Sequence, residues 1–119
     1  MISVLLVEDQ LMVRQGLRMR LGLEQDMQIV GEARDGIEAI ELAHQLHPDI
    51  VLMDVEMPRM DGITATKAIR AIAPEAKVVV VSLHCDLATQ MQAEAAGAVG
   101  FVAKHSGEEA LLRTIRRVV

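Results

Sequence analysis

The amino-acid sequence predicts an α/β protein, a doubly wound five-stranded parallel β-sheet with five helices. Four short apolar runs are nearly continuous, which is typical of strands covered on both faces. Apolar residues at helical spacing lie between the runs, and the connections are short. Strict alternation of strand and helix implies right-handed crossovers, so the helices should cover both faces of one parallel sheet.

The expected strands differ in how continuous their apolar character is. We expect residues 2–7, 50–53, 78–81 and 98–103 to form central strands, because few polar residues interrupt them. Residues 27–33 are mixed, since Gln28, Gly31 and Glu32 separate the apolar side chains. Residues 27–33 therefore suit a less buried strand at a sheet edge.

The helices are predicted from apolar spacing and from their starts. Asp35 with Glu38, and Ser106 with Glu109, each place a capping side chain three residues before an acid, as at a helix N-terminus. The clearest apolar series are Val13, Leu17 and Leu21; Ile63, Thr66, Ile69 and Ile72; and Leu111, Leu112, Ile115, Val118 and Val119.

Length and composition narrow the class of protein. The chain has 119 residues, which suits one domain, and its aromatic content of 1% requires an aliphatic core. A net charge of -5 argues against a free-standing nucleic-acid binder, because phosphate contacts need clustered Lys and Arg. A single cysteine, Cys85, cannot form an internal disulfide.

The two ends of the chain support further expectations about its surroundings. Neither a secretory leader nor a long apolar segment is present, so we expect a cytoplasmic protein without a membrane span. The last predicted helix stops at Val119 without Gly, Pro or a polar tail, which suggests a fragment of a longer protein.

Polar side chains converge where the predicted strands end. These are Glu8 and Asp9, Asp54, Ser82 and Lys104. Any one of them alone would be read as a solvated or helix-capping residue. Ligands of such sheets bind beyond the carboxyl ends of the strands, so the five together predict a site.

The chemistry of this set points to phosphoryl transfer. Clustered carboxylates repel one another unless a cation lies between them, and oxygen ligands without Cys or His favour Mg²⁺. Such an ion and Lys104 would neutralise the charge that keeps the Asp54 carboxylate from phosphorus. Ser82 could then hydrogen-bond the transferred group, which completes the parts needed for an aspartyl phosphate.

At this point the sequence resembles the receiver domain of bacterial two-component response regulators, over essentially all of residues 1–119. The motifs that carry the resemblance are specific only as a set. They are Val4-Leu5-Leu6-Val7-Glu8-Asp9, Asp54 with Met57-Pro58 and Asp61-Gly62, then Ser82, and Phe101-Val102-Ala103-Lys104. The resemblance implies a flavodoxin-like fold with strand order 2-1-3-4-5.

The resemblance also implies roles for single residues. Asp54 would be the phosphoacceptor, and Glu8 and Asp9 would be the acidic pair of the Mg²⁺ site. Glu56 would lend its backbone carbonyl to the metal, with little expected of its side chain. Ser82 would be the switch hydroxyl, Lys104 the phosphate-pairing lysine and Phe101 the switch aromatic, although an isolated phenylalanine would be read as plain core.

By the same resemblance, the protein would be a switch and not an enzyme, beyond self-catalysed phosphorylation and dephosphorylation of Asp54. Its partners would be a sensor histidine kinase and, after phosphorylation, a second copy of itself. Ser82-Leu83-His84 and the lack of proline after Lys104 resemble the branch with a LuxR-type helix-turn-helix output. DNA contact and transcription regulation would then belong to a C-terminal domain absent from this chain.

Other residues and other functions compete with this interpretation. His84 and His105 flank the expected pocket, where a histidine could serve as a donor or a metal ligand. His44 and His47 lack the further ligands of a zinc site and are expected at the surface. The Lys104-His105 bond could be cis or trans. A haloacid-dehalogenase-type phosphotransferase would need a second Asp two residues after the nucleophile, where this chain has Glu56. A receiver-like interaction module that is never phosphorylated is the other alternative.

Overall fold

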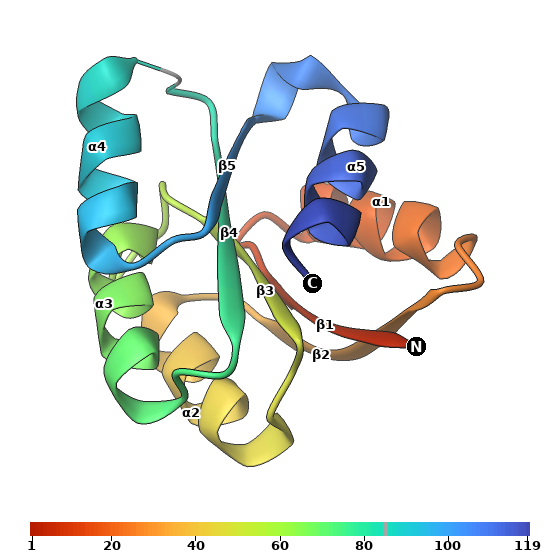
Figure 1. The fold of residues 1–119 in the computed structure, drawn as a ribbon, viewed down its shortest axis with the longest axis horizontal. Helices are drawn as coiled ribbons and strands as arrows, with labels where there is room; N and C mark the ends of the chain where they lie inside the picture. The colour runs from red at the N-terminus through yellow and green to blue at the C-terminus, as the bar shows by residue number, and fades with distance from the viewer. Residues whose placement is uncertain (85) are drawn as a thin grey trace.

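The protein alternates strands and helices along its whole length in the computed structural model, which describes residues 1–84 and 86–119. Cys85, and with it the expectation about disulfides, lies outside the described residues. The elements run in the following order: β1 Ile2–Val7, α1 Leu11–Gly22, β2 Met27–Ala33, α2 Gly36–Leu46, β3 Ile50–Asp54, α3 Gly62–Ile72, β4 Lys77–Ser82, α4 Leu87–Ala96, β5 Gly100–Ala103, the 3-10 turn η1 Lys104–Ser106, and α5 Glu108–Val118 (Figure 1).

The five strands form one parallel sheet in the order β2-β1-β3-β4-β5, which confirms the predicted fold and strand order. Strand β2 lies at an edge, as its mixed composition predicted. Strand β5 also lies at an edge, so the expectation that residues 98–103 form a central strand, which rested on their apolar character, was wrong. Its apolar character instead reflects its two covered faces, because α5 and α4 both contact it.

Helices cover both faces of the sheet, with α1 and α5 on one side and α2, α3 and α4 on the other (Figure 1). Each face holds its own hydrophobic core. One core includes Leu6, Leu52 and Leu111, and the other includes Leu5, Val51 and Ile69. Alternate residues of β1 and β3 therefore serve opposite cores, as the pleat of a strand requires.

Two predicted helix starts had different outcomes. Asp35 caps α2, since its Oδ1 accepts a hydrogen bond of 2.9 Å from the Glu38 backbone N–H. Ser106 does not cap α5, so that prediction was wrong. Ser106 ends the 3-10 turn, and Gly107, with φ of 90°, stands at the helix start without a side-chain cap.

Gly62 brings the start of α3 against the end of β3. A Cβ at this position would lie 2.0 Å from the backbone carbonyl oxygen of Asp54, which no side chain could tolerate. The Gly62 N–H donates to the carbonyl of Val55 at 3.0 Å, and Asp61 caps the helix through Ile63 and Thr64. The loop after Asp54 is thus closed tightly over the end of its strand.

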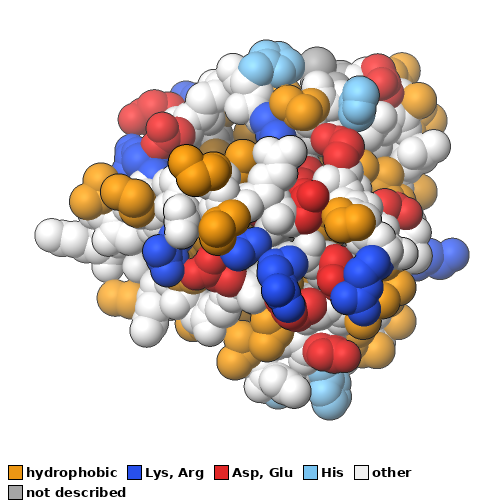
Figure 2. Space-filling view, turned by 180° about the vertical axis from the view of Figure 1, so that it is seen from behind, with side chains coloured by type: hydrophobic (Ala, Val, Ile, Leu, Met, Phe, Trp, Pro, Cys, Tyr) orange, Lys and Arg blue, Asp and Glu red, His pale blue; other side chains and the backbone are white. Residues whose placement is uncertain are grey.

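The surface carries charges of both signs. On the face shown in Figure 2, Lys and Arg side chains are interspersed with Asp and Glu side chains. Arg14 and Arg18 both lie beside Glu32, and Arg116 lies beside Asp26. In the part of the chain that the structure describes, no helix is both long and apolar enough to cross a membrane.

Candidate functional site

The predicted site residues meet at the carboxyl ends of the strands. Glu8 follows β1, Asp54 ends β3, Ser82 ends β4 and Lys104 follows β5. Glu8, Asp54 and Ser82 are each no more than 2% exposed, because the helices cover both faces of these strands. The sheet topology alone therefore brings together side chains that are far apart in the sequence.

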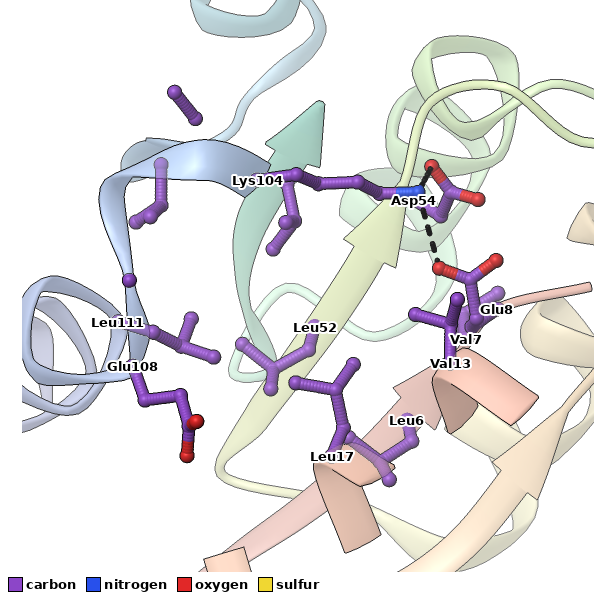
Figure 3. Close-up of a pocket in the computed structure, with 14 residues that line it drawn as sticks. Leu6, Val7, Glu8, Val13, Leu17, Leu52, Asp54, Lys104, Glu108 and Leu111 are labelled. Atoms are coloured by element: carbon purple, nitrogen blue, oxygen red, sulfur yellow. Dashed lines mark hydrogen bonds and ion pairs between the residues drawn. The ribbon is translucent and has the colours of Figure 1, made fainter. Parts of the chain in front are cut away.

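Lys104 connects two of the carboxylates. Its Nζ lies 3.0 Å from Oδ1 of Asp54 and 3.1 Å from Oε1 of Glu8, and Figure 3 shows the side chain extended toward both. No peptide bond among the described residues is cis, so the Lys104-His105 bond is trans. The missing proline therefore does not stop Lys104 from reaching the site.

The charge state of Asp54 reflects its buried position. Burial raises the pKa of the Asp54 carboxyl to about 7, and the negative charge of Glu8 adds to this, while Lys104 opposes it. The pKa of Lys104 is itself raised, because its contacts with Asp54 and Glu8 outweigh the effect of its own burial. The ionised form of Asp54 thus depends on nearby positive charge.

The arrangement also offers a place for a cation. Glu8, Asp9 and Asp54 each present a carboxylate oxygen, and these oxygens lie within 4.8 Å of one another. Oδ2 of Asp54 is buried without a hydrogen-bond partner, which is costly for a carboxylate oxygen unless something binds it. The donor set consists of hard oxygen ligands, which suit a small divalent cation.

Glu56 departs from what the sequence led us to expect. Its side chain accepts a hydrogen bond from Ser82 Oγ at 2.9 Å and another from the Leu83 N–H at 3.2 Å. The expectation that this side chain does little was wrong, because it binds both the predicted switch hydroxyl and the residue after it. Sequence spacing carries no signal for such a contact, which joins two neighbouring strand ends.

The comparisons with known proteins agree with this geometry. Residues 4–116 match the family described as the response regulator receiver domain. The chain belongs to this family. It is 41% identical over 115 residues to the uncharacterized transcriptional regulatory protein YxjL of Bacillus subtilis, covering 97% of this chain and 53% of that protein.

Two further matches show the range of the receiver family. A protein-glutamate methylesterase/protein-glutamine glutaminase of Caldanaerobacter subterraneus is 42% identical over 111 residues, or 92% of this chain and 30% of that protein. A two-component response regulator of the LuxR family from Aurantimonas sp. SI85-9A1 superposes with a TM-score of 0.94 at 34% identity, covering 98% of this chain and 83% of that one. The chain spans about half the length of YxjL and of the Brevibacillus brevis regulator DegU.

The predicted switch aromatic of the receiver, Phe101, lies in β5. It is partly buried and packs against the core on the α2–α4 side of the sheet. It pairs with Val80 of β4, while Ser82, two residues further along that strand, pairs with Ala103. Phe101 and Ser82 therefore lie on adjacent strands and close in register.

A cavity of about 390 Å³ opens beside the receiver's acidic site, between the sheet, α1 and α5. Its walls are mostly aliphatic, and Leu17, Leu52 and Leu111 face it in Figure 3. Glu8, Asp54 and Lys104 line the end nearest the strand tips. The Asp54 carboxyl is thus bordered by an apolar space on one side and by the carboxylates of Glu8 and Asp9 on the other.

The histidines remain outside this constellation. His84 and His105 are both exposed, and the His84 backbone N–H, not its ring, takes part by donating to Ser82 Oγ at 2.9 Å. His44 and His47 are exposed as predicted, with His47 beside Glu75 at 3.4 Å. The group of possible metal ligands found among the described residues consists of carboxylates.

Proposed function

We propose that Asp54 is the phosphoacceptor of a two-component signalling switch. The observation that carries this proposal is the surroundings of its carboxyl: Lys104 at 3.0 Å from one oxygen, and a second oxygen that is buried without a partner beside Glu8 and Asp9. An acceptor needs one oxygen free to attack and positive charge near the other. Both conditions are met at Asp54.

The proposed reaction forms an acyl phosphate. An oxygen of Asp54 bonds to phosphorus, the bond from phosphorus to the donor breaks, and the donor leaves with that electron pair. The donor would be the phosphohistidine of a sensor kinase, and the metal would be Mg²⁺ held by Glu8, Asp9, Asp54 and the Glu56 carbonyl. Bound there, the ion would supply charge neutralisation for the transferred group.

The residues of this chain would share the remaining work. Lys104 would move from the two carboxylates to a phosphoryl oxygen, and Ser82 would donate its hydroxyl proton to another. Movement of Ser82 would let Phe101 turn inward and would change the surface of α4, β5 and α5. Phosphorylation would thus shift the domain from one population to another, because both arrangements belong to one equilibrium.

The output of the switch is a further proposal. The name of YxjL and that of the LuxR-family structure favour transcription regulation through a C-terminal DNA-binding domain in the full protein, with dimerisation after phosphorylation. The methylesterase relative shows that receivers of similar sequence also occur within enzymes. On either path this chain would act as a cytoplasmic switch without a substrate to turn over.

Incubation with acetyl phosphate and Mg²⁺, followed by mass spectrometry, tests the proposal. We expect the mass of one phosphoryl group to be added, and we expect Asp54→Asn to abolish the gain. Asp86→Asn is a matched control, because Asp86 caps α4 and asparagine caps a helix equally well. A wild-type protein that gains no mass would contradict the proposal and favour an interaction module that is never phosphorylated.

A further inference from the structure

The side chain of Glu56 occupies the hydroxyl donor that the proposed switch would use, together with the backbone N–H of the next residue. Ser82 Oγ has one proton, and it donates that proton to Glu56 Oε2 at 2.9 Å. The Leu83 N–H, the next donor along the chain, points to the other oxygen of the same carboxylate at 3.2 Å. Neither donor can bind a phosphoryl oxygen while these two bonds persist.

The acceptor side of Ser82 is also occupied. The His84 N–H donates to Ser82 Oγ at 2.9 Å, so the hydroxyl is held from both directions. Ser82 is fully buried, and no water can easily replace Glu56 as its partner. The segment from Ser82 to His84, which leads toward α4, is thus fixed to the loop after β3 through one carboxylate.

We propose that Glu56 is a positioning residue that latches Ser82 and Leu83 in the unphosphorylated arrangement and so slows the modification of Asp54. The inference rests on the proposed function, and it adds a task for the side chain of Glu56 to the one suggested for its backbone. Phosphorylation must break both hydrogen bonds before Ser82 can turn to the new group. The latch therefore sets how much of the protein is ready to receive phosphate.

Glu56 could slow the modification of Asp54 either as a latch or through its negative charge alone, and three variants separate these explanations. Glu56→Asp keeps the charge but is shorter by one methylene, so its carboxylate should reach neither the Ser82 hydroxyl nor the Leu83 N–H. Glu56→Gln removes the charge but keeps a carbonyl oxygen for one of them. Glu56→Ala removes both the charge and the contacts. If Glu56 acts as a latch, Asp54 should be modified faster in Glu56→Asp and Glu56→Ala, and at an intermediate rate in Glu56→Gln. If the charge of Glu56 merely repels the anionic phosphodonor, the rate in Glu56→Asp should equal that of wild type, and the rate in Glu56→Gln should equal that in Glu56→Ala.

The experiment measures the rate at which Asp54 gains mass from acetyl phosphate in the wild type and the three variants. Loss of the two bonds should raise the rate about three- to tenfold in Glu56→Asp and Glu56→Ala. Thermal unfolding checks that each variant is folded. Equal rates in wild type and Glu56→Asp would overturn the latch, while a wild type that never gains mass would instead contradict the function on which it rests.

A second readout does not require phosphorylation. In the unmodified protein, the amide proton of Leu83 should exchange with solvent several times faster in Glu56→Asp and Glu56→Ala than in wild type, because its acceptor has gone. The amide of Val55, which bonds to the carbonyl of Val81, is the internal control and should be unchanged. An unchanged Leu83 amide in both variants would overturn the proposed contact in solution.

Discussion

The ammonium of Lys104 lies 3.0 Å from Oδ1 of Asp54, although Asp54 ends β3 and Lys104 follows β5, two strands that are not adjacent in the sheet. The same ammonium also reaches Glu8, so one cation offsets two buried carboxylates. The consequences of this pairing, and of the contacts around it, can be measured one residue at a time.

Replacing Lys104 with methionine should destabilise the metal-free protein. The change leaves Glu8 and Asp54 beside each other without a compensating charge, which we expect to cost about 1–3 kcal/mol at pH 8. Urea unfolding measures the loss, and added Mg²⁺ should recover part of it. Lys67→Met, at an exposed position in α3, should stay within about 0.5 kcal/mol of wild type. Equal losses in the two variants would show that the Lys104 pairing has no net value.

Replacing Asp54 with asparagine should change how stability depends on pH. The pKa of Asp54 is raised from 3.8 to about 7, so the folded protein holds this proton more tightly than the unfolded chain. Stability contributed by the protonated form is therefore lost as pH rises from about 4 to about 7. Asparagine cannot ionise, so this loss should be absent from Asp54→Asn. From pH 5 to pH 8, the free energy of unfolding of the variant relative to that of wild type should rise by about 1 kcal/mol or more, which corresponds to several degrees in Tm.

The matched control for the pH experiment is Asp86→Asn. The pKa of Asp86 is lowered, mainly by its hydrogen bond from the Thr89 N–H, so it is ionised throughout this range. Its substitution should shift Tm by the same amount at pH 5 and pH 8. A pH-independent difference between wild type and Asp54→Asn would contradict the raised pKa.

Replacing Ser82 with alanine should separate modification from its effect on the surface. Asp54 and Lys104 are untouched, so a phosphoryl mimic such as beryllofluoride with Mg²⁺ should still bind. Without the hydroxyl, the amide chemical-shift changes over α4, β5 and α5 should be smaller than in wild type. Ser106→Ala, at an exposed position, should respond as wild type does. Full-sized shift changes in Ser82→Ala would exclude the hydroxyl as the switch.

Replacing Gly62 with alanine should damage both stability and the site. The added Cβ would overlap the carbonyl oxygen of Asp54, so the start of α3 must move away from β3. We expect a loss of about 2 kcal/mol or more and slower modification of Asp54. Gly16→Ala is the control, because nothing lies within 4 Å of its added Cβ and alanine favours the interior of α1 by ~1 kcal/mol. Similar effects of the two changes would contradict the close approach.

The sheet could be predicted because burial on both faces leaves a strong pattern in the sequence. The run from Ile50 had to be apolar, since alternate residues enter different cores. The same pattern could not show that β5 lies at an edge, because helices cover a strand's faces whether or not it has two neighbours. The position of a strand in the sheet depends on pairing, which composition does not record.

The site was predictable in its members but not in all of its contacts. Asp54 and Lys104 could be assigned to strand ends, and parallel topology then brings all strand ends to one edge. The bond between Glu56 and Ser82 depends on the path of a loop after β3, which has no periodic signal. The start of α5 was misplaced for a related reason, since the 3-10 turn before Gly107 separates Ser106 from the helix that it was expected to cap.

Phe101 is the only aromatic residue of the chain, which has no Trp and no Tyr. The protein therefore lacks the Trp and Tyr absorbance and fluorescence with which folding is followed and concentration measured, and peptide-bond absorbance must serve instead. The same scarcity is useful. A sample grown with fluorinated phenylalanine would give the signal of a single ring, placed in β5 one strand from Ser82, and its spectrum would report the state of the domain without assignment.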